Sequence, residues 1–200
     1  AVYDGFPATL SGYLRRLHRW TRGDWQLLPF ILGQNGLDGL SRFLMLDNLA
    51  RSLCPAAALW TLVLSLWAGW LPGLLCALIY PFLPVLSALP LPSWGAVRRG
   101  IAQLALLPAL AVTQADAAAR ALYRMKVSHK NLLEWTPAAE ADRQGPGKEQ
   151  LPGRAAAILM APALLRTGWA PAALGLALAF AGGVPWLRAL EAREPRSRLT

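Results

Sequence analysis

The chain has 200 residues, of which 55% are hydrophobic and 16% are charged, and it contains nine tryptophans. This composition is too apolar for an ordinary water-soluble domain and indicates a membrane protein. The net charge is +9, but the cations flank apolar runs instead of forming a stripe with interleaved aromatic residues. We therefore expect a lipid bilayer and no nucleic acid as the partner. The two cysteines, Cys54 and Cys76, show neither metal-ligand spacing nor a disulfide framework.

The first 28 residues carry a dense cluster of cations and indoles. Residues 1–4 can end a strand, and a turn with Thr9 or Ser11 as N-cap leads into a helix predicted to run to about Leu28. Its apolar stripe consists of Leu14, Leu17, Thr21, Trp25 and Leu28. Its cationic face consists of Arg15, Arg19 and Arg22, with Trp20 beside them. Such a helix can anchor to acidic lipid headgroups, or it can offer arginines to phosphate oxygens and an indole to a sugar ring.

The order of residues in this helix resembles a glycosyltransferase motif. Arg16-x-x-Arg19-Trp20 followed by Arg22 is similar to the Gln-x-x-Arg-Trp signature of membrane-embedded processive glycosyltransferases of the cellulose and hyaluronan synthase type. The longer string at 18–29, His-Arg-Trp-Thr-Arg-Gly-Asp-Trp-Gln-Leu-Leu-Pro, resembles one branch of them, the cyclic β-1,2-glucan synthases. The resemblance implies that residues 1–52 are the end of a GT-A-type glycosyltransferase domain with interfacial signature helices.

The resemblance also implies roles for individual residues. Trp20 would stack on the acceptor sugar, and Arg19 would support the diphosphate of the donor. Arg22 is assigned to the same diphosphate side, together with Arg16, whose position is Gln in the wider signature. His18 can be taken for a general base, but we prefer helix packing or a headgroup contact for it. For Asp24 we prefer a cap or a pair with a neighbouring arginine on the same helix, and for Asp47 and Asn48 capping and helix packing.

Four apolar segments are predicted to form two transmembrane hairpins. Residues 53–71 carry no charge and are long enough to cross the hydrocarbon, and residues 74–91 follow after a Pro-Gly turn. The second hairpin consists of residues 153–168 and 169–187, with Arg166 reaching to the far interface. The predicted fold class is therefore mainly α, with interfacial amphipathic helices and about four transmembrane helices.

Residues 92–135 connect the two hairpins. The apolar part, 101–112, is about a dozen residues long and too short for a span, so residues 101–126 are predicted to be an interfacial or partly re-entrant helix. Met125-x-Val127-Ser128-x-Lys130 is similar to the Phe-x-Val-Thr-x-Lys gating loop of cellulose synthases. This resemblance implies that Ser128 and Lys130 contact the nucleotide; the alternative is a plain basic connector.

The distribution of basic residues predicts the orientation in the membrane. Residues 136–152 are predicted to be a cytoplasmic loop and residues 188–200 a basic cytoplasmic tail. With the four spans, every Lys and Arg of the 20 except Arg166 falls on one side. The positive-inside rule makes that side the cytoplasm, so both termini are expected on the cytoplasmic face of a bacterial inner membrane.

The resemblance implies an inverting glucosyltransferase that polymerises glucose from UDP-glucose into a growing cyclic β-1,2-glucan. The metal ligands for Mg²⁺ or Mn²⁺ and the catalytic aspartate are expected upstream of Ala1, so the chain itself is predicted to hold no catalytic or metal-binding residue and to be inactive alone. A region like a glycoside phosphorylase is expected after Thr200. The alternatives are a synthase of another polysaccharide and a non-catalytic membrane anchor or export module.

Overall fold

The computed structural model describes residues 9–33, 36–86, 93–130, 150–165 and 168–193. The predicted strand end at 1–4, most of the loop at 136–152 and the last residues of the basic tail lie outside these ranges. Contact clustering divides the chain into two compact units. Unit 1 comprises 1–57 and 110–147, and unit 2 comprises 58–109 and 148–200.

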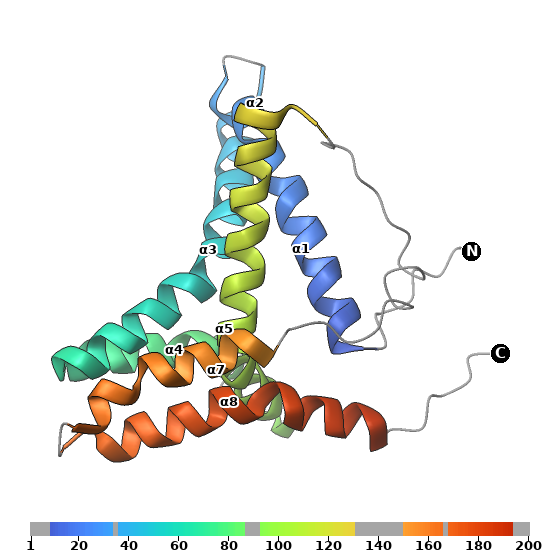
Figure 1. The fold of residues 1–200 in the computed structure, drawn as a ribbon. Helices are drawn as coiled ribbons and strands as arrows, with labels where there is room; N and C mark the ends of the chain where they lie inside the picture. The colour runs from blue at the N-terminus through green and yellow to red at the C-terminus, as the bar shows by residue number, and fades with distance from the viewer. Residues whose placement is uncertain (1–8, 34–35, 87–92, 131–149, 166–167, 194–200) are drawn as a thin grey trace. The chain divides into compact units, whose positions relative to one another are not determined.

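The described residues form helices and no strand (Figure 1). The predicted mainly α fold class is therefore confirmed. The elements, in chain order, are α1 (Leu10–Gln26), α2 (Leu28–Leu32), α3 (Gly39–Ala68), α4 (Leu71–Leu86), α5 (Trp94–Tyr123), the π-helix η1 (Arg124–Ser128), α7 (Gln150–Leu159), the 3₁₀ helix η2 (Ala161–Leu165) and α8 (Ala170–Arg193).

Three of these helices are long and apolar enough to cross a membrane, namely Gly39–Ala68, Trp94–Ser128 and Ala170–Leu190. The predicted spans 53–71 and 169–187 fall on α3 and α8. The predicted spans 74–91 and 153–168 correspond to the shorter apolar helices Leu71–Leu83 and Leu151–Leu165. The described residues thus contain three helices of spanning length and two shorter apolar helices, beside the prediction of about four transmembrane helices.

The helix α5 is longer than the sequence predicted. It begins at Trp94, where the Ser93 hydroxyl accepts a hydrogen bond from the Ala96 N–H at 3.2 Å, and η1 extends it to Ser128. The prediction began this helix at residue 101, after the arginines at 98 and 99, but arginine has good helix propensity and does not stop a helix. Pro108 is accommodated inside it, so the segment is long enough for a span, whereas the apolar part alone is not.

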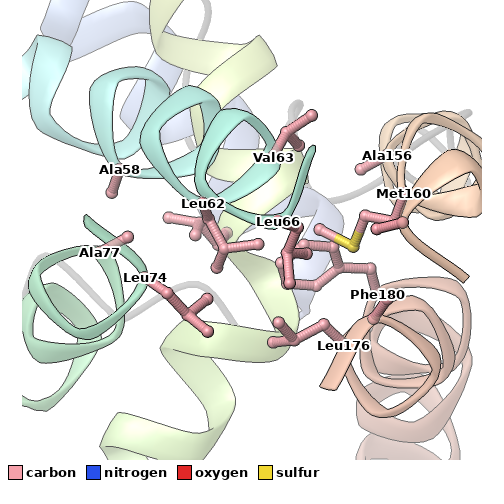
Figure 2. Close-up of a cluster of buried hydrophobic side chains, with 13 residues drawn as sticks. Ala58, Leu62, Val63, Leu66, Leu74, Ala77, Ala156, Met160, Leu176 and Phe180 are labelled. Atoms are coloured by element: carbon pink, nitrogen blue, oxygen red, sulfur yellow. The ribbon is translucent and has the colours of Figure 1, made fainter. Parts of the chain in front are cut away.

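The core of unit 2 is built from the apolar helices around the turn that follows α3 (Figure 2). Leu62 and Leu66 of α3 are fully buried and face Leu74 of α4, Met160 and Phe180. Gly69 makes the turn from α3 to α4 with a φ of 70°, which an L side chain rarely adopts. The Trp67 indole N–H donates to the Leu159 carbonyl at 2.7 Å, which ties the end of α3 to the end of α7.

Candidate functional site

The signature helix α1 packs its apolar stripe against protein. Thr9 is its N-cap, as predicted, and its Oγ1 accepts a hydrogen bond from the Gly12 N–H at 3.0 Å. Leu14 and Thr21 are only 4% and 3% exposed. The indole of Trp25 donates to Ser52 Oγ on α3 at 2.9 Å. Because protein covers these side chains, they are not available to contact lipid. In unit 1 this face of α1 therefore packs against other helices and does not anchor α1 in a bilayer.

Trp20 lies on the exposed side of the same helix. Its side chain is 54% exposed, although it is one of the largest apolar groups in the unit. The Arg16 guanidinium carbon lies over the ring, 4.5 Å from its centroid, a cation–π contact one helical turn away. Arg19 and Arg22 are partly buried along the same helix. The indole ring of Trp20 is therefore accessible from outside, stacks with the Arg16 guanidinium group and is attached to a regular helix.

His18 connects α1 to α5 through a carboxylate. Its Nε2 lies 2.9 Å from Asp116 Oδ2, and Arg120 Nε donates to the same oxygen at 2.7 Å. An ionised carboxylate only accepts, so Nε2 carries the hydrogen. Burial lowers the pKa of His18, the Asp116 hydrogen bond opposes this, and Arg120 and Arg22 lower the pKa further. The imidazole is thus neutral near pH 7 and serves helix packing, the role preferred from the sequence.

A second side-chain contact joins α1 to α3. The Asn48 side chain donates a hydrogen bond to the carboxylate of Asp24, whose pKa burial raises despite that bond. Asp24 therefore has an amide on α3 as its partner. Asp47 pairs with Arg51 one turn along α3, at 2.8 Å from its Nε. Asn48 thus makes a contact between helices, in line with the packing role preferred for it, whereas the ion pair of Asp47 was not predicted.

The residues of the predicted gating loop line a cavity of about 460 Å³ at the end of α5. The cavity is lined by Ala119, Arg120, Tyr123, Arg124, Ser128 and Lys130. It forms because α5 changes into the wider turn of η1, which ends at His129 with a left-handed φ of 50° and an N–H that donates to the Arg124 carbonyl at 2.8 Å. This volume suits a small ligand, and three cationic side chains around it favour an anion.

Sequence reasoning found two residues of this cavity and missed the others. Ser128 and Lys130 were predicted from the motif, whereas Arg120, Tyr123 and Arg124 had no assigned role. The signal available for them was spacing, since Arg120 and Arg124 are four residues apart and share one helix face. The signature residues of α1 lie outside the cavity lining, and Asp116 connects the two motifs by bonding both His18 and Arg120.

The residues that the structure describes contain no group of three or more His, Cys, Asp or Glu that could hold a metal ion. Asp24 and Asp116 are each engaged in hydrogen bonds between helices.

Comparison with known proteins agrees with the motif. No protein family model matches the chain. The chain is similar to the cyclic beta-(1,2)-glucan synthase NdvB of Rhizobium meliloti (strain 1021), with 37% identity over 73% of this chain. It spans only 6% of the length of that protein. The predicted resemblance is therefore confirmed: this chain is similar to a segment of a cyclic β-1,2-glucan synthase.

Proposed function

We propose that the chain is the acceptor-binding and membrane region of a membrane glycosyltransferase that polymerises glucose from UDP-glucose into cyclic β-1,2-glucan. The observation that carries the proposal is the exposure of Trp20. A large indole with 54% of its surface exposed stands on a helix that buries Leu14 and Thr21, inside the string that resembles the glucan synthases. The similarity of the chain to NdvB supports cyclic β-1,2-glucan as the product.

Trp20 binds the acceptor sugar in this proposal. The C–H groups on one face of a glucose ring are apolar and pack on an indole plane, while the hydroxyl groups at the rim stay hydrated. Arg16 lies over the indole, which restricts its rotation. This contact favours a positioning role for Arg16 over the diphosphate contact that the resemblance implied.

The donor diphosphate is bound by cations of unit 1. We assign Ser128 and Lys130 to it because they line one cavity with Arg120 and Arg124. A guanidinium group can donate two parallel hydrogen bonds to phosphate oxygens, and a hydroxyl can donate a third. We also assign Arg19 and Arg22 to the donor diphosphate, and this assignment rests only on the signature motif.

The proposed reaction is an inverting glucosyl transfer. A hydroxyl of the acceptor glucose attacks C1 of the donor, the bond from C1 to the diphosphate oxygen breaks, and the hydroxyl proton passes to a carboxylate base. UDP leaves with the electron pair, and its charge is stabilised by cations. We propose that the base and the ligands of an Mg²⁺ or Mn²⁺ ion belong to another part of the enzyme.

The test is glucan synthesis in membranes that contain the full-length protein, supplied with labelled UDP-glucose and magnesium. Trp20→Ala is compared with wild type and with Trp60→Ala, a matched control that removes an indole of 56% exposure from α3. We expect incorporation into soluble β-1,2-glucan to fall more than about tenfold in Trp20→Ala and to stay near wild type in Trp60→Ala.

Other outcomes separate the alternatives. Equal incorporation in all three proteins would reduce the signature helix to a structural element. Incorporation from a different nucleotide-sugar, with none from UDP-glucose, would identify a synthase of another polysaccharide. If the full-length protein transferred no sugar from any nucleotide-sugar, the alternative of a non-catalytic membrane anchor or export module would be supported.

A further inference from the structure

A second cavity, of about 650 Å³, lies in unit 2 between the start of α5 and the end of α8. Its lining includes two arginines (Arg98, Arg99), two tryptophans (Trp94, Trp186) and two leucines (Leu187, Leu190). Neither the signature motif nor the proposed glucosyl transfer uses any of these residues. The lining therefore combines cations with large apolar groups at a place that has no assigned role.

The cavity forms where the two helices diverge. Their backbones come closest at Ala105 and Gly183, since a Cβ on Gly183 would lie 2.5 Å from the Ala105 carbonyl oxygen. From this point the cavity lining continues toward lower numbers on α5 and higher numbers on α8. The cavity therefore lies on one side of this close approach. The small residues permit the close approach, and the larger side chains beyond it wall the cavity.

The position of the cavity fits an interface between hydrocarbon and headgroups. It lies at one end of each of two helices that are long and apolar enough to cross a membrane. Only 22% of the apolar window of α8 is buried inside the protein, so most of that surface is available to acyl chains. Trp94 and Trp186 are 72% and 48% exposed, and tryptophan is enriched at the level of the headgroups.

We propose that this cavity binds an anionic phospholipid. Arg98 and Arg99 hold the phosphate, because guanidinium groups donate paired hydrogen bonds to its oxygens. The upper part of an acyl chain packs along Trp186, Leu187 and Leu190. A free phosphate or a soluble nucleotide would use the arginines and leave the apolar wall exposed to water, so the lining favours a lipid over either.

The test uses the full-length protein in detergent and measures binding of dioctanoyl phosphatidylglycerol by native mass spectrometry. The variants are Arg98→Gln, Arg99→Gln and the double variant. Arg154→Gln is the matched control, because Arg154 is exposed on α7 and does not line the cavity. Dioctanoyl phosphatidylcholine serves as the zwitterionic probe and inorganic phosphate as the competitor.

We expect phosphatidylglycerol to bind wild type and Arg154→Gln equally and to bind the double variant about tenfold more weakly. Each single variant should lie between these values, and excess inorganic phosphate should leave the lipid bound. Three results would each overturn the proposal: equal binding by the double variant, equal binding of phosphatidylcholine, or displacement of the lipid by phosphate. This assay measures no glucosyl transfer, so its result does not depend on the proposed function.

Discussion

At the scale of single residues, the contribution of the contact between Arg16 and Trp20 to the rate of glucan synthesis can be measured. An exposed cation–π contact contributes about 0.5–1 kcal/mol, which corresponds to about a two- to fivefold change in rate if the contact is needed in the transition state. We therefore expect Arg16→Ala to lower glucan synthesis by about this factor, and Arg16→Gln to restore most of it, because an amide plane can also stack on an indole. The measurement is the initial rate of labelled glucose incorporation in membranes.

Arg15→Ala is the control for this pair, because Arg15 has the same partial burial on the same helix and its Nε donates to the Ser11 carbonyl at 3.3 Å. It should leave the rate close to wild type. If Arg15→Ala and Arg16→Ala lower the rate equally, the effect belongs to the net charge of α1 and the stacking argument is wrong.

His18 gives a second prediction at this scale, concerning pH. Burial lowers its pKa below the ordinary value of 6.5, so the unfolded chain takes up a proton more readily than the folded one. Stability is therefore retained above pH 6.5 and is lost as the pH falls through that value toward the lowered pKa. We expect the amide hydrogens of α1 in the full-length protein to exchange faster at pH 5.5 than at pH 7.5, after correction for intrinsic rates.

His18→Gln isolates this titration. Its side-chain amide can still donate to Asp116, but it does not ionise in this range. The acceleration at low pH should disappear in this variant. The other histidine, His129, is present in both proteins and is therefore common to both sides of the comparison. An unchanged pH response in His18→Gln would assign the effect to other groups.

Sequence patterns predicted local contacts and missed distant ones. The cap at Thr9 and the stripe through Leu14 follow from spacing along one helix, and the structure contains both. The bond between His18 and Asp116 joins residues 98 positions apart, and no local pattern encodes it. Arg120 was missed as a cavity residue for the same reason, because its place depends on how α5 continues into η1.

At the scale of elements, α8 carries a matched pair of glycines that tests the helix packing in unit 2. A Cβ on Gly183 would meet the Ala105 backbone of α5, whereas a Cβ on Gly182 would have nothing within 4 Å. Gly183→Ala must move a backbone, so we expect faster amide exchange in α5 and α8. Gly182→Ala gains helix propensity of up to about 1 kcal/mol and should slow exchange or leave it unchanged.

The measurement is hydrogen exchange by mass spectrometry on the full-length protein in detergent, with peptides from α1 as an internal reference. Equal effects of the two substitutions would mean that α5 and α8 do not approach closely at Ala105. The cavity proposed to bind lipid would then lose its geometric basis. The effect of Gly183→Ala on phosphatidylglycerol binding should accordingly follow its effect on exchange.

Helix ends were predicted well where a charged residue or a proline lies at the end of the helix. They were predicted poorly where such a residue lies inside the helix. Pro29 falls in the first turn of α2, after α1 has ended at Gln26, so the predicted end near Leu28 is close. Pro55 and Pro108 lie inside α3 and α5, and Arg98 and Arg99 lie in the early turns of α5. Neither feature stops a helix that packs against others, which is why α5 begins at Trp94, ahead of the predicted start at 101.

At the scale of the whole molecule, the two motifs that resemble glycosyltransferases and the apolar core belong to different units. The signature helix and the residues of the gating motif are in unit 1, and the packed helices around Leu62 and Phe180 are in unit 2. Composition alone predicted a multi-pass helical membrane protein, because uncharged apolar runs of about 20 residues usually form transmembrane helices. It could not predict which of the shorter helices, α4 and α7, cross the bilayer, because length leaves both below a full span.

We predict that both ends of the chain face the cytoplasm, because the arginines of α1 and those at the end of α8 are both dense and the cytoplasmic side retains such charge. Three full spans alone would place the ends on opposite sides, so the prediction requires one of the two shorter apolar helices to cross as well, which makes four crossings. The measurement uses the full-length protein with Cys54 and Cys76 replaced by Ser, single cysteines at Gly36→Cys or Ala192→Cys, and a membrane-impermeant maleimide. Both cysteines should react in inside-out vesicles and stay protected in intact spheroplasts, whereas Pro72→Cys, in the first turn of α4, should show the reverse. Opposite labelling of Gly36→Cys and Ala192→Cys would mean that the chain crosses the membrane an odd number of times between these positions, and the prediction would be wrong.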